Sequence, residues 1–90
     1  MNVLTGSELR QLDLQRNQLS GAVPPSIGRL QNLLYLNIKD NQSLSGRLPL
    51  TQLLSLNKLN RLSLVHCNFV DTEYAVEALK QHLPRCKVWI

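Results

Sequence analysis

The sequence predicts an α/β solenoid, in which a short parallel β-sheet forms the concave face and 3₁₀, extended or helical segments form the back. Two observations lead to this prediction. Leucine carries most of the apolar content of a chain that is 43% hydrophobic and only 4% aromatic. In addition, one arrangement of leucines recurs along the chain, and within each copy apolar residues alternate with polar ones, as in a strand with one buried face.

The recurring unit has four apolar positions and one asparagine or cysteine. The three copies are Leu9, Leu12, Leu14, Asn17 and Leu19, then Leu33, Leu36, Ile38, Asn41 and Leu44, then Leu59, Leu62, Leu64, Cys67 and Phe69. Val88 and Ile90 occupy the first strand positions of a fourth copy. We therefore expect one segment over residues 1–90, with about three repeats and a terminal strand, at 9–32, 33–58, 59–84 and 86–90.

This pattern, L-x-x-L-x-L-x-x-N/C-x-L, resembles the leucine-rich-repeat family from about Leu9 to Ile90. The resemblance implies a protein- or peptide-binding module. Two turns also share the form L-x-G-x-hydrophobic-P, at residues 19–24 and 44–49. They resemble plant-type repeats of receptor-like kinases and receptor-like proteins, and similar repeats occur in surface antigens of kinetoplastid parasites. That resemblance implies a signalling role and an extracellular or cell-surface parent.

Glycine and proline determine the conformation that we expect for the back segments. Glycine permits a tight bend and proline blocks a long helix, so we expect extended or 3₁₀ backs for the first two units. The third unit lacks that turn, and its apolar residues Ala75, Val76, Leu79 and Leu83 share one helical face. It predicts a helix of about three turns, capped by Asp71 or Thr72 and ended by Pro84, which resembles ribonuclease-inhibitor-type repeats.

The asparagine or cysteine of each unit is expected to form a structural ladder. Asn17 and Asn41 should satisfy backbone groups of neighbouring turns with buried amides, and Cys67 should fill the same place as a small buried donor.

The outward strand positions are expected to align in columns across the concave face. The columns are Gln11, Tyr35, Arg61 and Lys87, then Asp13, Asn37, Ser63 and Trp89, then Gln15, Lys39 and Val65, with Arg16, Asp40 and His66 at the edge. Aromatic residues and arginine are typical of binding hot spots. We therefore predict that the partner-binding residues are Tyr35, Asn37, Lys39, Arg61, Ser63, Val65, Lys87 and Trp89.

Two other functions stay open. The chain could be a structural or capping scaffold of a longer solenoid without a ligand of its own, in which case the open sheet edge at Ile90 predicts self-association. Phosphate or nucleic-acid contact through Arg16, Lys39, Arg61 and Lys87 is the third hypothesis. We do not expect nucleic acid to be the partner, because a net charge of +4 falls short of a dense basic stripe.

The sequence offers no catalytic constellation, and we expect no enzyme, metal or cofactor. A zinc site from His66, Cys67, His82 and Cys86 is not expected, because no paired C-x₂-C spacing occurs. A Cys67 to Cys86 disulfide would have to span roughly 20 Å along the strand direction, so both should be free thiols, which are compatible with the cytoplasm. Asn41-Gln42-Ser43 matches the glycosylation triplet, but its asparagine is expected to be buried in the ladder.

The residues themselves do not indicate the cellular compartment of the protein. Met1–Gly6 lack the charged start and apolar run of an export signal, and the apolar stretches are too short to span a bilayer.

Overall fold

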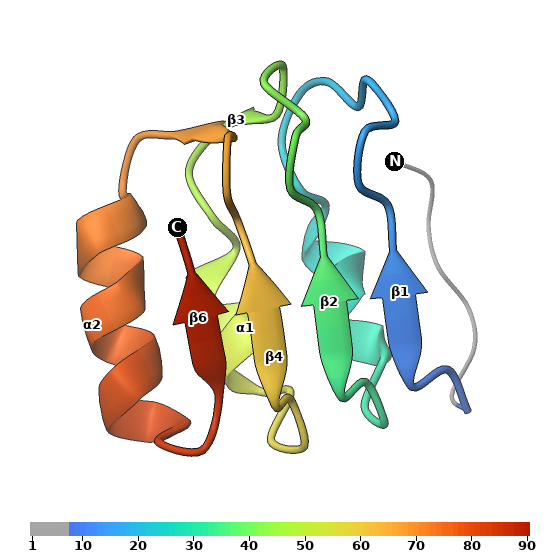
Figure 1. Cartoon of the computed structure of the whole chain (residues 1–90). Coiled ribbons are helices and arrows are strands. Elements are labelled where there is room, and N and C mark those ends of the chain that lie inside the picture. The colour runs from blue at the N-terminus through green and yellow to red at the C-terminus, as the bar shows by residue number, and fades with distance from the viewer. Residues whose placement is uncertain (1–7) are drawn as a thin grey trace.

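The computed structural model describes residues 8–90, so our expectation that Met1–Gly6 carry no export signal lies outside the described part. The main element is a four-stranded parallel sheet whose strands lie side by side in chain order (Figure 1). The strands are β1 (Gln11–Asp13), β2 (Tyr35–Asn37), β4 (Arg61–Ser63) and β6 (Lys87–Trp89).

The register of the sheet follows the sequence repeat. Tyr35 pairs with Gln11 on one side and with Arg61 on the other, and Arg61 pairs with Lys87. Residues at the same place in successive repeats are therefore direct neighbours in the sheet, although they are 24 or 26 positions apart in sequence.

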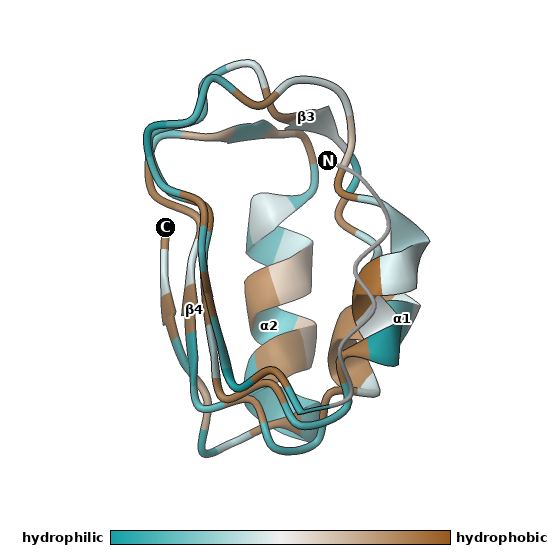
Figure 2. Ribbon diagram, turned by 90° about the vertical axis from the view of Figure 1, so that its right-hand side faces the viewer, coloured by the Kyte–Doolittle hydropathy of each residue, from teal (hydrophilic) through white to brown (hydrophobic). Residues whose placement is uncertain are grey.

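Within the described part of the chain, the back of the molecule consists of three helical segments, and Figure 2 shows the back on the side opposite the strands. They are the 3₁₀-helix η1 (Pro25–Arg29) and the α-helices α1 (Leu50–Leu54) and α2 (Thr72–His82). The 3₁₀ segment and the long third helix agree with the sequence patterns. Glycine at position 28 lets α1 pack closely on η1, since a Cβ there would lie 3.0 Å from the Cβ of Gln52.

The second back segment differs from the prediction, because α1 is a short α-helix and not extended or 3₁₀. The N–H of Leu53 bonds to the carbonyl of Pro49, four residues earlier, at 2.9 Å. Pro49 precedes the first helical residue, where a proline removes no helical hydrogen bond, and the residues after it form helices readily. The first unit instead carries Pro25 and Gly28 inside its back segment.

The start of α2 also differs in detail from the prediction. Asp71 stands at the N-cap position of α2, but no side chain there bonds to the first turn of the helix. Its carboxylate instead accepts the N–H of Leu48, at 3.1 Å, from the turn before α1. The hydroxyl of Thr72 donates to the carbonyl of Phe69. Asp71 therefore connects two turns of the fold and does not cap its own helix.

A second ladder closes the turns beyond the carboxyl ends of the strands. Its parallel strands are β3 (Ser45–Gly46) and β5 (Asn68–Phe69), and a bridge between Gly21 and Leu44 continues it to the first turn. Gly21 and Gly46 have φ near +79° and +78°, a left-handed conformation that glycine adopts without steric cost.

The core lies between the sheet and the back segments, and leucine fills most of it. Among the described residues, the fully buried side chains include Leu30, Leu33, Leu36, Leu53, Leu56, Leu62 and Leu79. The leucine bias of the sequence thus has a structural cause: each turn is too thin to form a core alone, and the inward leucines of successive turns pack into one. The result is a solenoid-like α/β fold.

Candidate binding face

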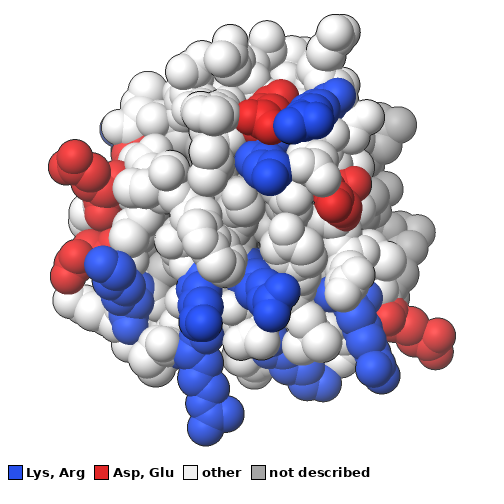
Figure 3. Space-filling model, viewed as in Figure 1, with Lys and Arg blue, Asp and Glu red and all other residues white. Residues whose placement is uncertain are grey.

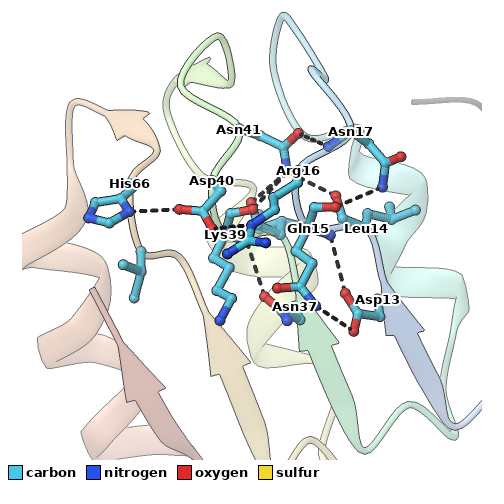
Figure 4. Close-up of polar contacts among 12 residues, drawn as sticks. Asp13, Leu14, Gln15, Arg16, Asn17, Asn37, Lys39, Asp40, Asn41 and His66 are labelled. Atoms are coloured by element: carbon cyan, nitrogen blue, oxygen red, sulfur yellow. Dashed lines mark hydrogen bonds and ion pairs between the residues drawn. The ribbon is translucent and has the colours of Figure 1, made fainter.

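The turn after β2 is held by the side chain of Asn41, which is only 1% exposed. Its amide nitrogen donates to the carbonyls of Leu14 and Ile38, both at 2.9 Å (Figure 4). Its amide oxygen accepts the N–H groups of Asn17 and Leu19, at 3.1 and 3.0 Å. One buried amide therefore joins the first turn to the second. Because this side chain is buried and its polar atoms are used, it offers no free acceptor for a glycan.

The other two ladder residues behave differently. Asn17 was expected to be buried, but it is exposed, and its amide donates to the carbonyl of Gln15 within its own turn. Asn17 follows the edge strand β1, and no earlier turn within residues 8–90 packs against it. Cys67 is half-buried and its thiol donates to the carbonyl of Ile38 at 3.1 Å.

Both cysteines are free thiols in the structure. Burial raises the pKa of the Cys67 thiol above its usual 9.0, and it raises the pKa of Cys86 to about 11. A thiol is nucleophilic only as the thiolate, so burial makes both side chains poor nucleophiles at neutral pH.

The exposed face of the sheet contains a hollow of about 360 Å³ over β2, β4 and β6. The residues that line it are Tyr35, Lys39, Arg61, Ser63, Val65 and Trp89. All six belong to the binding residues predicted from the sequence, and the structure brings them together from three strands and the turns after two of them. The two remaining candidates, Asn37 and Lys87, lie on the sheet outside this lining.

The middle column of the face is less accessible than the sequence predicted. Asn37 and Ser63 are only 3% and 7% exposed, whereas Trp89 on the edge strand is 45% exposed. Asn37 lies between Asp13 and Ser63 across the sheet, and Ser63 lies between Asn37 and Trp89. Neighbours on both sides cover the central members of the column. The amide oxygen of Asn37 also accepts the N–H of Lys39 at 3.1 Å. Asn37 and Ser63 therefore support the face, and we no longer expect Asn37 to contact a partner.

A row of three polar side chains, those of Arg16, Asp40 and His66, crosses the turns at the carboxyl ends of the strands (Figure 4). Asp40 is its centre: one carboxylate oxygen lies 3.3 Å from Nε of Arg16 and the other 2.7 Å from Nδ1 of His66. All three residues have φ near +60°, which places them in the left-handed region where residues other than glycine are uncommon. The sequence placed these residues in one column but did not reveal that they form a connected row. The sequence feature that could have indicated this row is the equivalent place of the three residues in successive repeats.

The hydrogen bond from His66 is the main reason why the pKa of Asp40 lies below its usual 3.8, and Arg16 adds to the effect. Because the pKa of Asp40 is lower in the folded chain than in the unfolded chain, its ionised carboxylate stabilises the fold. This contribution to the free energy of unfolding is present above pH 3.8, and it is lost as the pH falls through the pKa of the folded state.

We therefore expect Asp40→Asn to melt at a lower temperature than the wild type at neutral pH. This gap, the difference between the two melting temperatures, should narrow once the pH falls below 3.8. Thermal melts followed by circular dichroism over this range measure the gap. In a His66→Gln background the same substitution should have a smaller effect, because the main partner of Asp40 is gone. A gap that did not change with pH would contradict the role assigned to this row.

The cations of the sheet face are not neutralised in the same way. Within residues 8–90, Lys39, Arg61 and Lys87 form no ion pair. Figure 3, which views this face, shows basic side chains across its lower part, with acidic ones at the flanks and beside the upper turns. The face therefore combines aromatic and aliphatic surface with unpaired positive charge. Among the described residues, no group of histidine, cysteine or acidic side chains is placed to hold a metal ion, and no helix is long and apolar enough to cross a membrane.

A repeat fold with an open sheet face of this kind suits a general protein-binding module, and the comparison with protein families supports that class. The family model described as Leucine Rich Repeat matches residues 8–30. This match covers the first described turn, and it supports a leucine-rich-repeat family, which is typically non-enzymatic. A search of curated proteins finds no match.

Proposed function

We propose that this chain is a leucine-rich-repeat segment of about three repeats that binds a protein or peptide through its concave sheet face. The observation that carries the proposal is the hollow that gathers Tyr35, Arg61 and Trp89 with Lys39 and Val65. Aromatic residues and arginine dominate the energetics of known protein interfaces, and here they surround one depression on an accessible face.

The two turns at residues 19–24 and 44–49 support a further assignment, to a receptor-like or surface protein of the plant type. The α-helical back of the third unit is of a different kind, so this part of the proposal rests on two turns only.

The experiment that tests binding is a selection of peptides from a displayed library on the immobilised chain, followed by affinity measurements on two matched variants. Trp89→Ala removes an aromatic side chain from the hollow. Tyr74→Ala removes one from α2, where Tyr74 is 72% exposed and lies outside the sheet. We expect Trp89→Ala to weaken the selected peptides by ~30-fold, as for a hot-spot residue, and Tyr74→Ala to leave them unchanged.

Equal losses in the two variants, or no loss in either, would contradict binding at the concave face. A selection that returns no peptide would leave the face without a ligand and would favour the second candidate function.

That second candidate is a structural or capping piece of a longer solenoid. It is supported by β6, an edge strand of the sheet that ends on Trp89, which is 45% exposed, and is followed by Ile90, which is 61% exposed. Unpaired edge strands promote pairing with another chain. Light scattering on the same two variants separates the candidates, because a mass that rises with concentration and falls in Trp89→Ala indicates that this residue serves self-association.

A further inference from the structure

We infer that the hollow on the concave face recognises an acidic segment of a partner protein, and that Lys39 and Arg61 receive the carboxylate of an aspartate or glutamate side chain. This inference rests on the proposed function and names the chemistry of its partner.

Asp13 and Asp40, the acidic residues of this face, already have hydrogen-bond or ion-pair partners. Asp13 accepts the N–H of Gln15 at 3.2 Å and its side-chain amide at 3.3 Å. Asp40 is held between Arg16 and His66. Neither carboxylate pairs with a cation of the hollow. The positive charges of Lys39 and Arg61 are therefore available to a ligand, and both side chains line the same depression.

The walls of the hollow favour a charged ligand group that has apolar neighbours. Tyr35, Val65 and Trp89 supply apolar surface around the two cations. Apolar walls lower the local dielectric constant, and a concave site lined by one sign of charge concentrates its field. A carboxylate gains more from such a site than from isolated surface lysines. The same walls favour an aromatic or aliphatic residue beside the acidic one, so the fitting ligand is an acidic and apolar peptide segment.

The number of cations in the hollow favours this ligand over a nucleic acid. Tight binding of a phosphate backbone needs several cations along its path, and its affinity falls steeply with salt. The hollow offers two cations among its lining residues, which is fewer than a phosphate backbone needs for tight binding. A single carboxylate within an otherwise apolar segment needs no further cations.

The test uses fluorescence anisotropy with three labelled probes: a short peptide of leucine and phenylalanine with one central glutamate, the same peptide with glutamine for glutamate, and a single-stranded oligothymidine. We expect the glutamate peptide to bind ~10-fold or more tightly than the glutamine peptide. The double variant Lys39→Glu with Arg61→Glu should abolish that preference. The matched control is Arg47→Glu with Lys80→Glu, which makes the same change in net charge at exposed positions outside the hollow and should keep the preference.

Several outcomes would overturn the inference. Equal affinities for the two peptides would show that the hollow does not recognise the carboxylate. Equal losses in the two double variants would show attraction by net charge alone, and oligothymidine binding that depends on Lys39 and Arg61 would assign the cations to phosphate. A different result would contradict the proposed function, namely peptide binding that Trp89→Ala leaves unchanged. Selected peptides that are neutral or basic and still depend on Trp89 would overturn only the inference about acidic segments.

Discussion

Replacing Asn41 with alanine should destabilise the fold by about 3 to 5 kcal/mol, a large part of the total stability of a domain of this size. The buried amide serves carbonyl groups and N–H groups of two successive turns. Alanine would leave these backbone groups without partners, and an orphaned buried polar group costs about 1 to 3 kcal/mol. Urea unfolding followed by far-UV circular dichroism measures the loss.

The matched control is Asn17→Ala, at the same place in the preceding repeat. Asn17 is exposed, and within residues 8–90 its side-chain amide bonds to its own turn, so this substitution should cost under about 1 kcal/mol. Similar losses for the two variants would mean that the asparagine acts through the local turn and not through the contact between turns.

Leu62→Ala should destabilise the protein by about 2 to 5 kcal/mol, because it empties a fully buried position on the inner face of β4. Strands lie on both sides of β4, and back segments cover the inner face, so few neighbours can move to fill the cavity. Differential scanning calorimetry and urea unfolding would report the loss.

Leu12→Ala is the corresponding variant on the edge strand β1. Leu12 pairs with Leu36 in the same row of the sheet but is only partly buried, so its truncation should cost clearly less than that of Leu62. If the edge variant were as damaging as the central one, burial within the stack would not be the source of the stability.

Much of the sheet could be predicted from the sequence, because the repeat places equivalent residues in register. Leu12, Leu36 and Leu62 are recognisable as inward residues, and they pair as the spacing indicates. The length of a back segment is harder to predict, because it depends on a competition between local tendencies. Pro49 fits the start of either a 3₁₀-helix or an α-helix, and the residues after it decide for the α-helix.

The candidate site could be predicted in outline, since the residues around the hollow lie in columns that the repeat defines. Accessibility could not be predicted in the same way. Asn37 and Trp89 occupy equivalent positions, yet one is covered on both sides and the other lies on an edge strand. The row of Arg16, Asp40 and His66 requires side-chain directions that a spacing pattern does not contain.

The unequal spacing of the repeats has a consequence for how such a protein can diverge. The interval from β1 to β2 is two residues shorter than the later intervals, yet Gln11, Tyr35, Arg61 and Lys87 stay directly paired. The additional residues are accommodated outside the sheet, in the turns and the back. Insertions and deletions in those segments can therefore accumulate without shifting the face, while substitutions at the exposed outward strand positions can change its surface without disturbing the core. The chemistry of the face and the length of the chain can evolve independently in this architecture.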